Sequence, residues 1–359
     1  MHSKVIEFWE NAGYHLIDED VYFKRIESNK SWINWLLIDS SSKYITFAAM
    51  IYSDMPKANV YFFQNEGSRL RSVLPFFEVN SWLTGRRGVA LPFTDDCEPL
   101  FSDAAAAKNL MQAALEFGKR RGWKSIEWRG GRELFDDALA SLSFYGHSMN
   151  LETNEDKMFE RLESSVRRAI RKGEKSGVTM NVSNSLDSIK MFYSLQCLTR
   201  RKHGLPPQPF AFFQNVYEQI LSKNLGMIVS ASHEGRPIAA SVYFQLGKRA
   251  VYKYGAANEA FQHLRGANLV MWEAVRWLAR RGARTLHLGR TSPGNEGLRR
   301  FKLGWGAEEQ KIEYMKFDLR KNCFVADTDE AFGWHNRVFC LLPTGLSRAV
   351  GAALYRHWA

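Results

Sequence analysis

Cysteine is scarce in this chain, and its distribution argues against two kinds of cysteine-dependent site. The four cysteines, at positions 97, 197, 323 and 340, lie far apart, form no CxxC pair and have no cluster of histidines beside them. Zinc sites and disulfide frameworks both depend on closely spaced or paired cysteines. We therefore expect neither a metal site nor structural disulfides.

Long apolar runs are also missing. A helix needs about 20 predominantly apolar residues to cross a bilayer, and no stretch of the chain approaches this. The first residues, Met1 to Glu10, carry acids and lack the apolar core that a signal peptide requires. We therefore expect a protein of the reducing cytoplasm with no membrane-spanning segment.

Acidic residues are in deficit: 38 of them face 49 lysines and arginines, which gives a net charge of +11. Such an excess favours an anionic partner, either a nucleic acid, a phosphate-bearing substrate or an acidic membrane surface. A basic enzyme without such a partner explains the charge equally well. DNA is not expected as a partner.

The length of 359 residues exceeds that of one compact domain, so we expect two. The first part is rich in β-branched and aromatic residues and predicts strands. They are expected over Ser31–Asp39, Tyr44–Tyr52, Val60–Gln64 and Val89–Phe93. A helix over Asp103–Arg121, ended by Gly122, and a strand over Ser125–Arg129 follow.

The second half repeats this plan. Strands are predicted over Met227–Ser232, Pro237–Leu246, Ala250–Ala256, Thr285–Gly289 and Lys311–Leu319, with a helix over Asn268–Arg281. The junction Arg120–Trp128 matches Arg280–Leu288: each is a basic helix end, a glycine, a basic residue and a strand. Either any helix–glycine–strand junction looks like this, or the chain holds a duplicated domain. The expected α/β domains span residues 1–150 and 151–325, with a tail at 326–359.

Residues Asn154 to Lys175 predict a basic helical segment between the halves. Met158, Leu162, Val166 and Ile170 recur every four residues and predict a buried stripe. Four cations share one face of the same segment, at Arg168, Arg171, Lys172 and Lys175. Such a face is either solvated or able to bind phosphate.

The tail carries a second four-residue repeat, at Leu346, Val350, Leu354 and Trp358. The repeat predicts a helix that either docks on the body of the protein or lies at an anionic membrane surface. The second interpretation gives the protein a peripheral position at the inner face of the membrane.

Binding chemistry is predicted between Tyr252 and Gly306. The strand at Val251–Ala256 ends in small residues and leads to a helix that starts near Asn268. Unpaired N–H groups at such a helix start bind anions and acyl carbonyls. A loop rich in glycine and a basic turn with two further glycines follow, over 289–297 and 298–306. Loops of this kind commonly hold binding residues.

Several segments, in their order and spacing, resemble the FemAB group of the GNAT (N-acetyltransferase) superfamily. They are the basic helix at 166–178, the helix start at 267–275, and the strand at 289–291 with the turn at 301–307. Residues 91–93 resemble a strand of the group's first domain, and residues 200–206 resemble acyltransferase relatives associated with bacterial polysaccharide export. The resemblance covers most of residues 85–318. It implies two tandem GNAT-like α/β domains with mixed sheets flanked by helices.

The resemblance also implies transfer of an acyl or aminoacyl group to an amine of a cell-envelope polymer precursor, of the exopolysaccharide or peptidoglycan type. No tightly bound cofactor is implied; acyl-CoA or aminoacyl-tRNA is the co-substrate, and the acceptor carries phosphate or a lipid. The candidate catalytic residues are Tyr254, Glu273 and Lys302. The candidate binding residues are Arg168, Arg171, Lys172, Gly255, Asn268, Arg290, Phe301 and Gly304. Residues of these types are more often a core tyrosine and a surface or structural ion pair, and this is the simpler interpretation of Tyr254 and Glu273.

Two departures from the superfamily leave the donor open. Ordinary GNAT enzymes bind CoA with a Gln/Arg-x-x-Gly-x-Gly/Ala loop, and residues 263–268 do not fit it. Residues 178–225 are too short and too interrupted for the helical arm of members that use transfer RNA. The alternatives are a tRNA-dependent enzyme that builds peptidoglycan bridges and a non-catalytic module that binds an anionic lipid or polymer.

Overall fold

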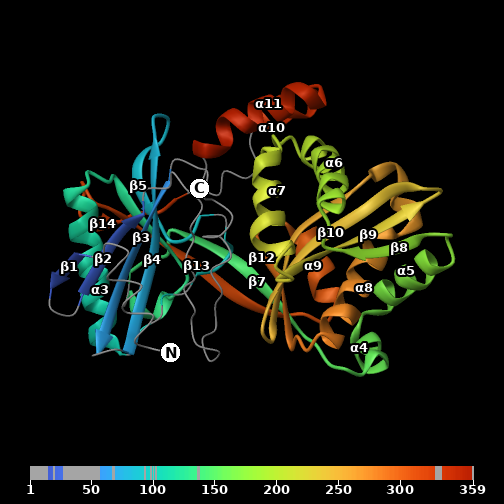
Figure 1. Cartoon of the computed structure of the whole chain (residues 1–359), viewed down its shortest axis with the longest axis horizontal. Coiled ribbons are helices and arrows are strands. Elements are labelled where there is room, and N and C mark those ends of the chain that lie inside the picture. Colours follow the sequence, from blue (N-terminus) through green and yellow to red (C-terminus); the bar gives the residue numbers. More distant parts are fainter. Residues whose placement is uncertain are drawn as a thin grey trace. The chain divides into compact units, whose positions relative to one another are not determined.

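The computed structural model describes residues 15–18, 21–26, 57–66, 69–92, 94–97, 99, 101, 103–135, 138–327 and 334–357 (Figure 1). They form two compact units. The first unit takes its residues from Met1–Ser143, Ile312–Asp329 and Arg356–Ala359, and the second from Phe144–Lys311 and Glu330–Tyr355. The strands predicted over Ser31–Asp39 and Tyr44–Tyr52 lie outside the described residues.

A mixed sheet and one long helix build the first unit. In sheet order its strands are β1 (His15–Asp18), β2 (Val21–Ile26), β3 (Lys57–Glu66), β4 (Arg69–Ser81), β5 (Gly85–Val89), β6 (Ser125–Arg129) and β13 (Glu308–Asp318), with β14 (Cys323–Phe324) beside β13. The first four residues of β13 belong to the second unit. Neighbouring strands run antiparallel except β5 and β6. The helix α3 (Ala104–Arg120) packs its apolar side on the sheet, and the short η1 (Arg132–Leu134) follows β6. The strand predicted over Val89–Phe93 is wrong: β5 ends at Val89, because Leu91 has a φ of 39° that no strand allows.

The second unit holds a mixed sheet with helices on both faces (Figure 1). In sheet order its strands are β7 (Leu142–Asn150), β12 (Thr285–Thr291), β11 (Arg249–Ala257), β10 (Arg236–Leu246), β9 (Gly226–His233) and β8 (Thr179–Ser183). One face is covered by α4 (Glu155–Arg161), α5 (Ser164–Glu174) and α8 (Gly266–Arg280). The other carries α6 (Leu186–Lys202), α7 (Phe210–Val216) and the π-helix η2 (Tyr217–Leu221), with α10 (Trp334–Leu341) and α11 (Thr344–Leu354) against α6. The short helices η3 (Glu259–Leu264) and α9 (Glu296–Gly304) lie in connections, and η4 (Tyr355–His357) follows α11. No helix in the described ranges is long and apolar enough to cross a membrane.

The predicted helix–glycine–strand junction occurs once in each unit with the same hydrogen bonds. Gly122 ends α3 with a φ of 68°, and Gly282 follows α8 with a φ of 84°, a conformation that favours glycine. The next residue, Trp123 or Ala283, donates its N–H to a carbonyl five residues earlier at 2.9 or 3.0 Å. In both units the strand after the junction then pairs in parallel with the strand before the helix. The mixed α/β architecture predicted from the sequence is confirmed.

The basic segment at residues 154–175 lies within the second unit and forms two helices rather than one. The chain is extended at Leu162 and Glu163, with ψ values of 144° and 149°, so α4 ends and α5 begins. The break allows the Glu163 N–H to donate to the Gly304 carbonyl at 2.9 Å, which ties α5 to the end of α9. The apolar stripe nevertheless stays buried, since all four of its members are at most 7% exposed.

Candidate functional site

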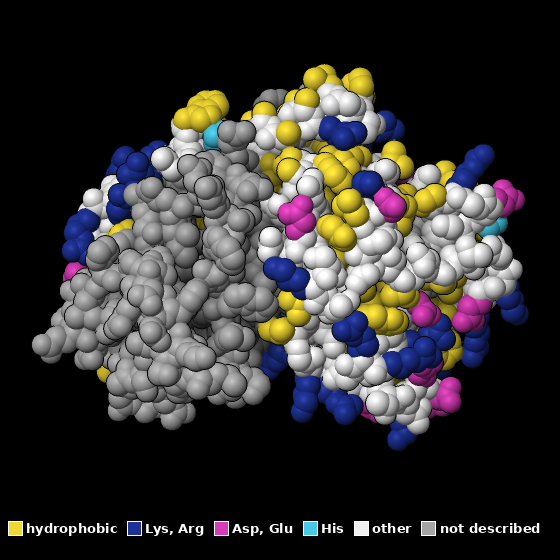
Figure 2. Space-filling view, in the orientation of Figure 1, with side chains coloured by type: hydrophobic (Ala, Val, Ile, Leu, Met, Phe, Trp, Pro, Cys, Tyr) yellow, Lys and Arg dark blue, Asp and Glu magenta, His cyan; other side chains and the backbone are white. Residues whose placement is uncertain are grey.

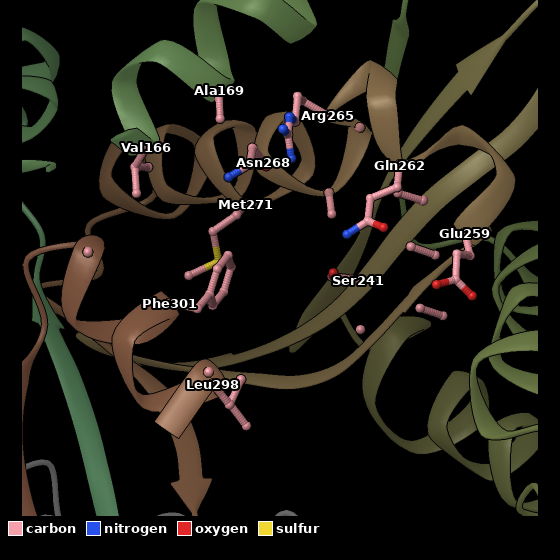
Figure 3. Close-up of a pocket in the computed structure, with 18 of the residues that line it drawn as sticks. Val166, Ala169, Ser241, Glu259, Gln262, Arg265, Asn268, Met271, Leu298 and Phe301 are labelled. Carbon is pink, nitrogen blue, oxygen red and sulfur yellow. The ribbon is translucent and has the colours of Figure 1, made fainter. Parts of the chain in front are cut away.

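A cavity of about 890 Å³ opens in the second unit beside the carboxyl end of β11 (Figure 3). The strands β11 and β12 pair in parallel only at their starts, Arg249–Val251 with Thr285–His287. Beyond that point the ladder ends, which leaves room between the two strand ends. The carboxyl ends of parallel strands are common ligand sites for this reason. The walls come from α5, the end of α6, η3, the start of α8, and α9.

A β-bulge shapes the floor of the cavity. The register between β10 and β11 shifts between Val242 and Tyr243, so that Ser241 faces Gly255 while Tyr243 faces Tyr252. Tyr252 therefore packs with the cluster beneath α8 and lines the cavity together with Gly255. A Cβ atom on Gly255 would lie 1.6 Å from the Tyr252 hydroxyl oxygen, so only glycine fits there. The Tyr252 ring and the Gly255 backbone together form the floor of the cavity.

Two hydroxyl groups meet on this floor. The Ser241 Oγ lies 3.4 Å from the position that a Cβ of Gly255 would take, which places it beside the Tyr252 hydroxyl. Burial raises the pKa of the Tyr252 phenol, and a hydrogen bond with Ser241 opposes this effect. Tyr252 is therefore protonated at neutral pH and able to donate a hydrogen bond into the cavity.

The start of α8 forms one end of the cavity. Arg265, in the left-handed conformation with a φ of 58°, turns the chain into the helix. Its carbonyl accepts the N–H groups of Asn268 and Leu269 at 3.0 and 3.3 Å. The earlier N–H groups, of Gly266 and Ala267, have no carbonyl within the helix to bind, and both residues line the cavity. A helix start of this kind attracts anions.

Cationic side chains from four elements surround the same cavity. They are Arg168 and Lys172 of α5, Lys202 of α6, Arg265 before α8, and Arg300 of α9. Figure 3 shows Arg265 and Asn268 at the end of the cavity nearest α5. Two acids also line the space, and one of them, Glu259, is paired with Lys202 at 2.7 Å. The positive charges are therefore in excess at the cavity.

The opposite wall is apolar. Figure 3 shows Met271 of α8 and Phe301 of α9 pointing into the space, with Leu298 beside them on α9. The cavity thus joins an anion-binding end, an apolar wall and a floor with two hydroxyl groups. This combination suits an elongated ligand with phosphates at one end and a less polar reactive group at the other.

Seven of the eleven predicted site residues line this cavity: Arg168, Lys172, Gly255, Asn268, Phe301, Lys302 and Gly304. Lys302 has a more particular setting than the others, because it is only 4% exposed. Its Nζ donates to the carbonyls of Gly289 and Arg290 at 2.8 and 3.0 Å. These hydrogen bonds tie the Lys302 ammonium group to the end of β12.

Tyr254 and Glu273 do not line the cavity. The ring of Tyr254 lies on the face of the sheet that α6 and α7 cover, with its centroid 5.5 Å from that of Phe213. Glu273 forms an ion pair with Arg276 on the same helix. Glu273 thus takes part in an ion pair, and Tyr254 is a half-buried tyrosine packed against aromatic side chains.

Arg171 and Arg290 also lie away from the cavity. The Arg171 guanidinium stacks 5.4 Å from the ring centre of Phe159, and that of Arg290 lies 4.1 Å from the ring centre of Phe144. These aromatic contacts hold the two cations on other parts of the second unit.

Sequence reasoning missed Tyr252, Ser241, Gln262, Arg265 and Met271 as lining residues. Strand alternation places Tyr252 and Gly255 on opposite faces, and the bulge that brings them together has no strong sequence signature. The signal for Arg265 was present: a cation followed by Gly266 directly before a predicted helix.

A partly buried charged cluster ties α9 to the neighbouring strands. His147, with no exposed side-chain surface, lies 3.1 Å through Nε2 from Glu309, and Arg299 of α9 binds the same carboxylate at 2.7 and 2.8 Å. Hydrogen bonds from Arg299 hold the pKa of Glu309 below its usual range. Burial, together with repulsion from Lys302, lowers the pKa of His147. Neutral His147 and ionised Glu309 are thus the forms that the fold stabilises.

We expect acidification to destabilise the second unit through this cluster. Because both folded-state pKa values are depressed, the stabilisation is complete above the unfolded pKa of histidine, about 6.5. It is lost as the pH falls below that value. Urea unfolding at pH 7 and pH 5 should show a clear loss in the free energy of unfolding, and His147→Gln should make that loss smaller. An equal loss in the variant would contradict this assignment.

Comparison with known proteins agrees with this geometry. Residues 161–311, which contain the whole cavity lining, match the family described as an acetyltransferase (GNAT) domain. This segment of the chain is therefore similar to a GNAT acetyltransferase domain. No curated protein sequence matches it.

Two solved structures share the fold at low sequence identity. FemX is 13% identical over 70% of this chain and 87% of its own, with a TM-score of 0.56. The C-terminal domain of a protein assigned as a lysylphosphatidylglycerol synthetase, from Agrobacterium fabrum, is 15% identical over 79% and 88%, with a TM-score of 0.53. The chain thus has the fold of these two proteins, and the domain match supports the GNAT resemblance seen in the sequence for residues 161–311.

Proposed function

We propose that this protein transfers an acyl group from acyl-CoA to an amine of a cell-envelope polymer precursor, and that the domain at 151–325 carries the reaction. The observation that supports this most is the cavity, which has cations and a helix start at one end and the Tyr252 floor at the other. An acyl-CoA molecule has the matching order of groups, with phosphates at one end and a thioester at the other.

In this proposal, the phosphates of the donor bind at the start of α8. The N–H groups of Gly266 and Ala267, with the side chains of Arg168, Lys172 and Arg265, supply hydrogen bonds and positive charge there. The loop at residues 263–268 departs from the usual CoA-binding pattern, but it keeps two features that suit phosphate binding. A small residue lets the backbone approach the phosphates, and a cation stands next to it.

In the same proposal, the thioester carbonyl of the donor lies on the floor of the cavity. When the amine attacks the thioester carbon, the C–N bond forms and negative charge develops on the carbonyl oxygen. The C–S bond then breaks, the attacking nitrogen loses a proton, and the CoA thiolate takes up a proton and leaves as the free thiol. The Tyr252 hydroxyl, protonated and held by Ser241, is the donor that faces this charge. Gly255 leaves the space in which the carbonyl can reach that hydroxyl.

The acceptor class is inferred from the fold and from the charge of the cavity. FemX and a domain assigned to lysylphosphatidylglycerol synthesis have the same fold, and the second acts on a lipid by its name. The excess of cations around the cavity suits an acceptor that carries phosphate, such as a nucleotide-linked or lipid-linked amino sugar or peptide.

A donor panel tests the proposal. The purified protein is supplied with acetyl-CoA or longer acyl-CoA donors and with nucleotide-linked amino sugars or muropeptides, and release of the CoA thiol is followed with a thiol reagent. We expect release that depends on the acceptor amine. Transfer from aminoacyl-tRNA with no thiol release from any acyl-CoA would instead make the protein a tRNA-dependent aminoacyltransferase. Transfer from neither class of donor would contradict the proposal.

A further inference from the structure

The C-terminal segment differs in charge from the rest of the chain. Residues 331–359 contain three arginines and no aspartate or glutamate. The helices α10 and α11 belong to this segment, and α11 packs against α6 in the second unit. A helix on the surface of a protein usually turns a charged or polar face to water. An apolar outward face on α11 would therefore indicate a contact with something other than water.

The outward face of α11 is mainly apolar, and the inward face consists of small residues. Gly351 is buried so closely that a Cβ atom there would lie 2.0 Å from the Pro207 carbonyl oxygen, and Ser347 beside it is 2% exposed. The exposed residues of the helix are Gly345, Leu346, Arg348, Ala349, Ala352 and Ala353. The helix thus turns leucine and alanines to the outside, with one cation among them.

The end of α10 adds a second exposed leucine. Leu341 is 85% exposed and Leu346 is 52% exposed, although both are large apolar side chains. Figure 2 shows hydrophobic side chains gathered over α10 and α11, with cationic ones at their edge. The Arg201 side chain reaches the same place from α6, where it donates to the Thr344 hydroxyl at 3.4 Å.

A hollow of about 340 Å³ lies beside this face, between α11 and the helices α6 and α7. Aromatic and small side chains line it, among them Tyr193, Phe210 and Ala352. Among the described residues that line it, the one cation is Arg348, whose guanidinium lies 5.2 Å from the ring centre of Tyr193. A hollow lined by aromatic and small side chains with an arginine on its rim suits a phospholipid, since it offers space for part of an acyl chain and a partner for a phosphate.

We propose that the face formed by Leu341, Leu346, Arg348 and the exposed alanines of α11 lies on an anionic lipid bilayer. The leucines enter the region between headgroups and acyl chains, while Arg348 and Arg201 bind lipid phosphates. The absence of acids from residues 331–359 makes the segment complementary to a negative surface. The proposal does not depend on the reaction proposed above.

Vesicle sedimentation tests the proposal on the full chain. Vesicles of phosphatidylcholine with and without phosphatidylglycerol are mixed with the wild type and with the double variant Leu341→Asp/Leu346→Asp. The matched control is Leu139→Asp, a leucine of the first unit that is also 85% exposed. We expect the wild type and the control to bind the anionic vesicles, and the double variant to bind about tenfold more weakly.

A second variant tests the role of charge. Arg348→Ala should reduce the preference for phosphatidylglycerol about fivefold, and Arg348→Lys should restore most of it, because one basic residue near the surface has an effect of this size. Thiol release with a soluble acceptor should be unchanged in all of these variants, which separates loss of lipid binding from loss of transfer.

Three results would overturn the proposal. The wild type could fail to sediment with anionic vesicles, or the Leu139→Asp control could lose binding as strongly as the double variant. Alternatively, light scattering could show a wild-type dimer that the double variant dissociates, with no vesicle binding by either. In that case the apolar face is occupied by a second copy of the chain.

Discussion

Gly255→Ala is expected to lower kcat/KM for acyl transfer about 100- to 1,000-fold, a loss typical of a displaced catalytic group. The added Cβ would occupy a point 1.6 Å from the Tyr252 hydroxyl oxygen, so the ring must leave its place on the cavity floor. The carbonyl of the donor then loses both its space and its hydrogen-bond donor. Because the change acts at the reacting group, kcat should fall more than KM rises.

The control for this variant is Gly294→Ala. Gly294 lies in the loop before α9, and a Cβ atom there would meet no atom within 4 Å. The control should keep near wild-type kinetics, and thermal unfolding of both variants should show that the fold is retained. A Gly255→Ala enzyme with full activity would mean that Tyr252 does not contact the acyl group.

The double variant Arg168→Ala/Lys172→Ala is expected to raise the KM for the acyl-CoA donor by a factor of about 10 to 100. Both side chains line the cavity from α5 and are exposed, so each contact with a phosphate contributes about 1 kcal/mol, the upper end for exposed charge pairs. Two such contacts together correspond to roughly a 30-fold change in affinity. Both contacts exist in the ground state and in the transition state, so kcat should change little. Steady-state kinetics with the donor varied measure the effect.

The matched control lies on the same helix. Arg171 and Lys175 are equally exposed on or directly after α5 but do not line the cavity. Arg171→Ala/Lys175→Ala removes the same charge and should leave the KM for the donor within about twofold of the wild type, as expected for screened surface charges. If both double variants raised KM equally, the general positive field of α5 rather than the cavity would bind the donor.

The two faces of the basic segment at residues 154–175 differ in how well the sequence predicted them. The repeat from Met158 to Ile170 predicted the buried face of the segment correctly, because burial of an apolar stripe follows from helical spacing. The same spacing grouped four cations on the opposite side. Only Arg168 and Lys172 line the cavity, because its position depends on α8 and α9, and these pack against α5 from far along the chain.

The floor of the cavity was beyond sequence reasoning for another reason. The sequence predicted a strand that contains both Tyr252 and Tyr254, and Tyr254 was the candidate catalytic residue. The bulge in the ladder between β10 and β11 assigns the two rings to different environments, one in the cavity and one against α6 and α7. A one-residue shift of register reverses every side chain beyond it, and only the paired strand reveals it.

The junction glycines illustrate the opposite case. Gly122 and Gly282 were predicted to end helices, and their left-handed conformations confirm it. A helix end of this kind is local, since it depends on backbone hydrogen bonds within a few residues. Local features were therefore predictable, whereas the cavity is made by contacts between distant segments.

The most direct test of the proposed site is a crystal structure of the protein with a non-hydrolysable acyl-CoA analogue. The phosphates are expected within hydrogen-bonding distance of the N–H groups of Gly266 and Ala267, with the acyl carbonyl at the Tyr252 hydroxyl. An analogue bound elsewhere, or bound in this cavity with its phosphates directed away from the start of α8, would contradict the account.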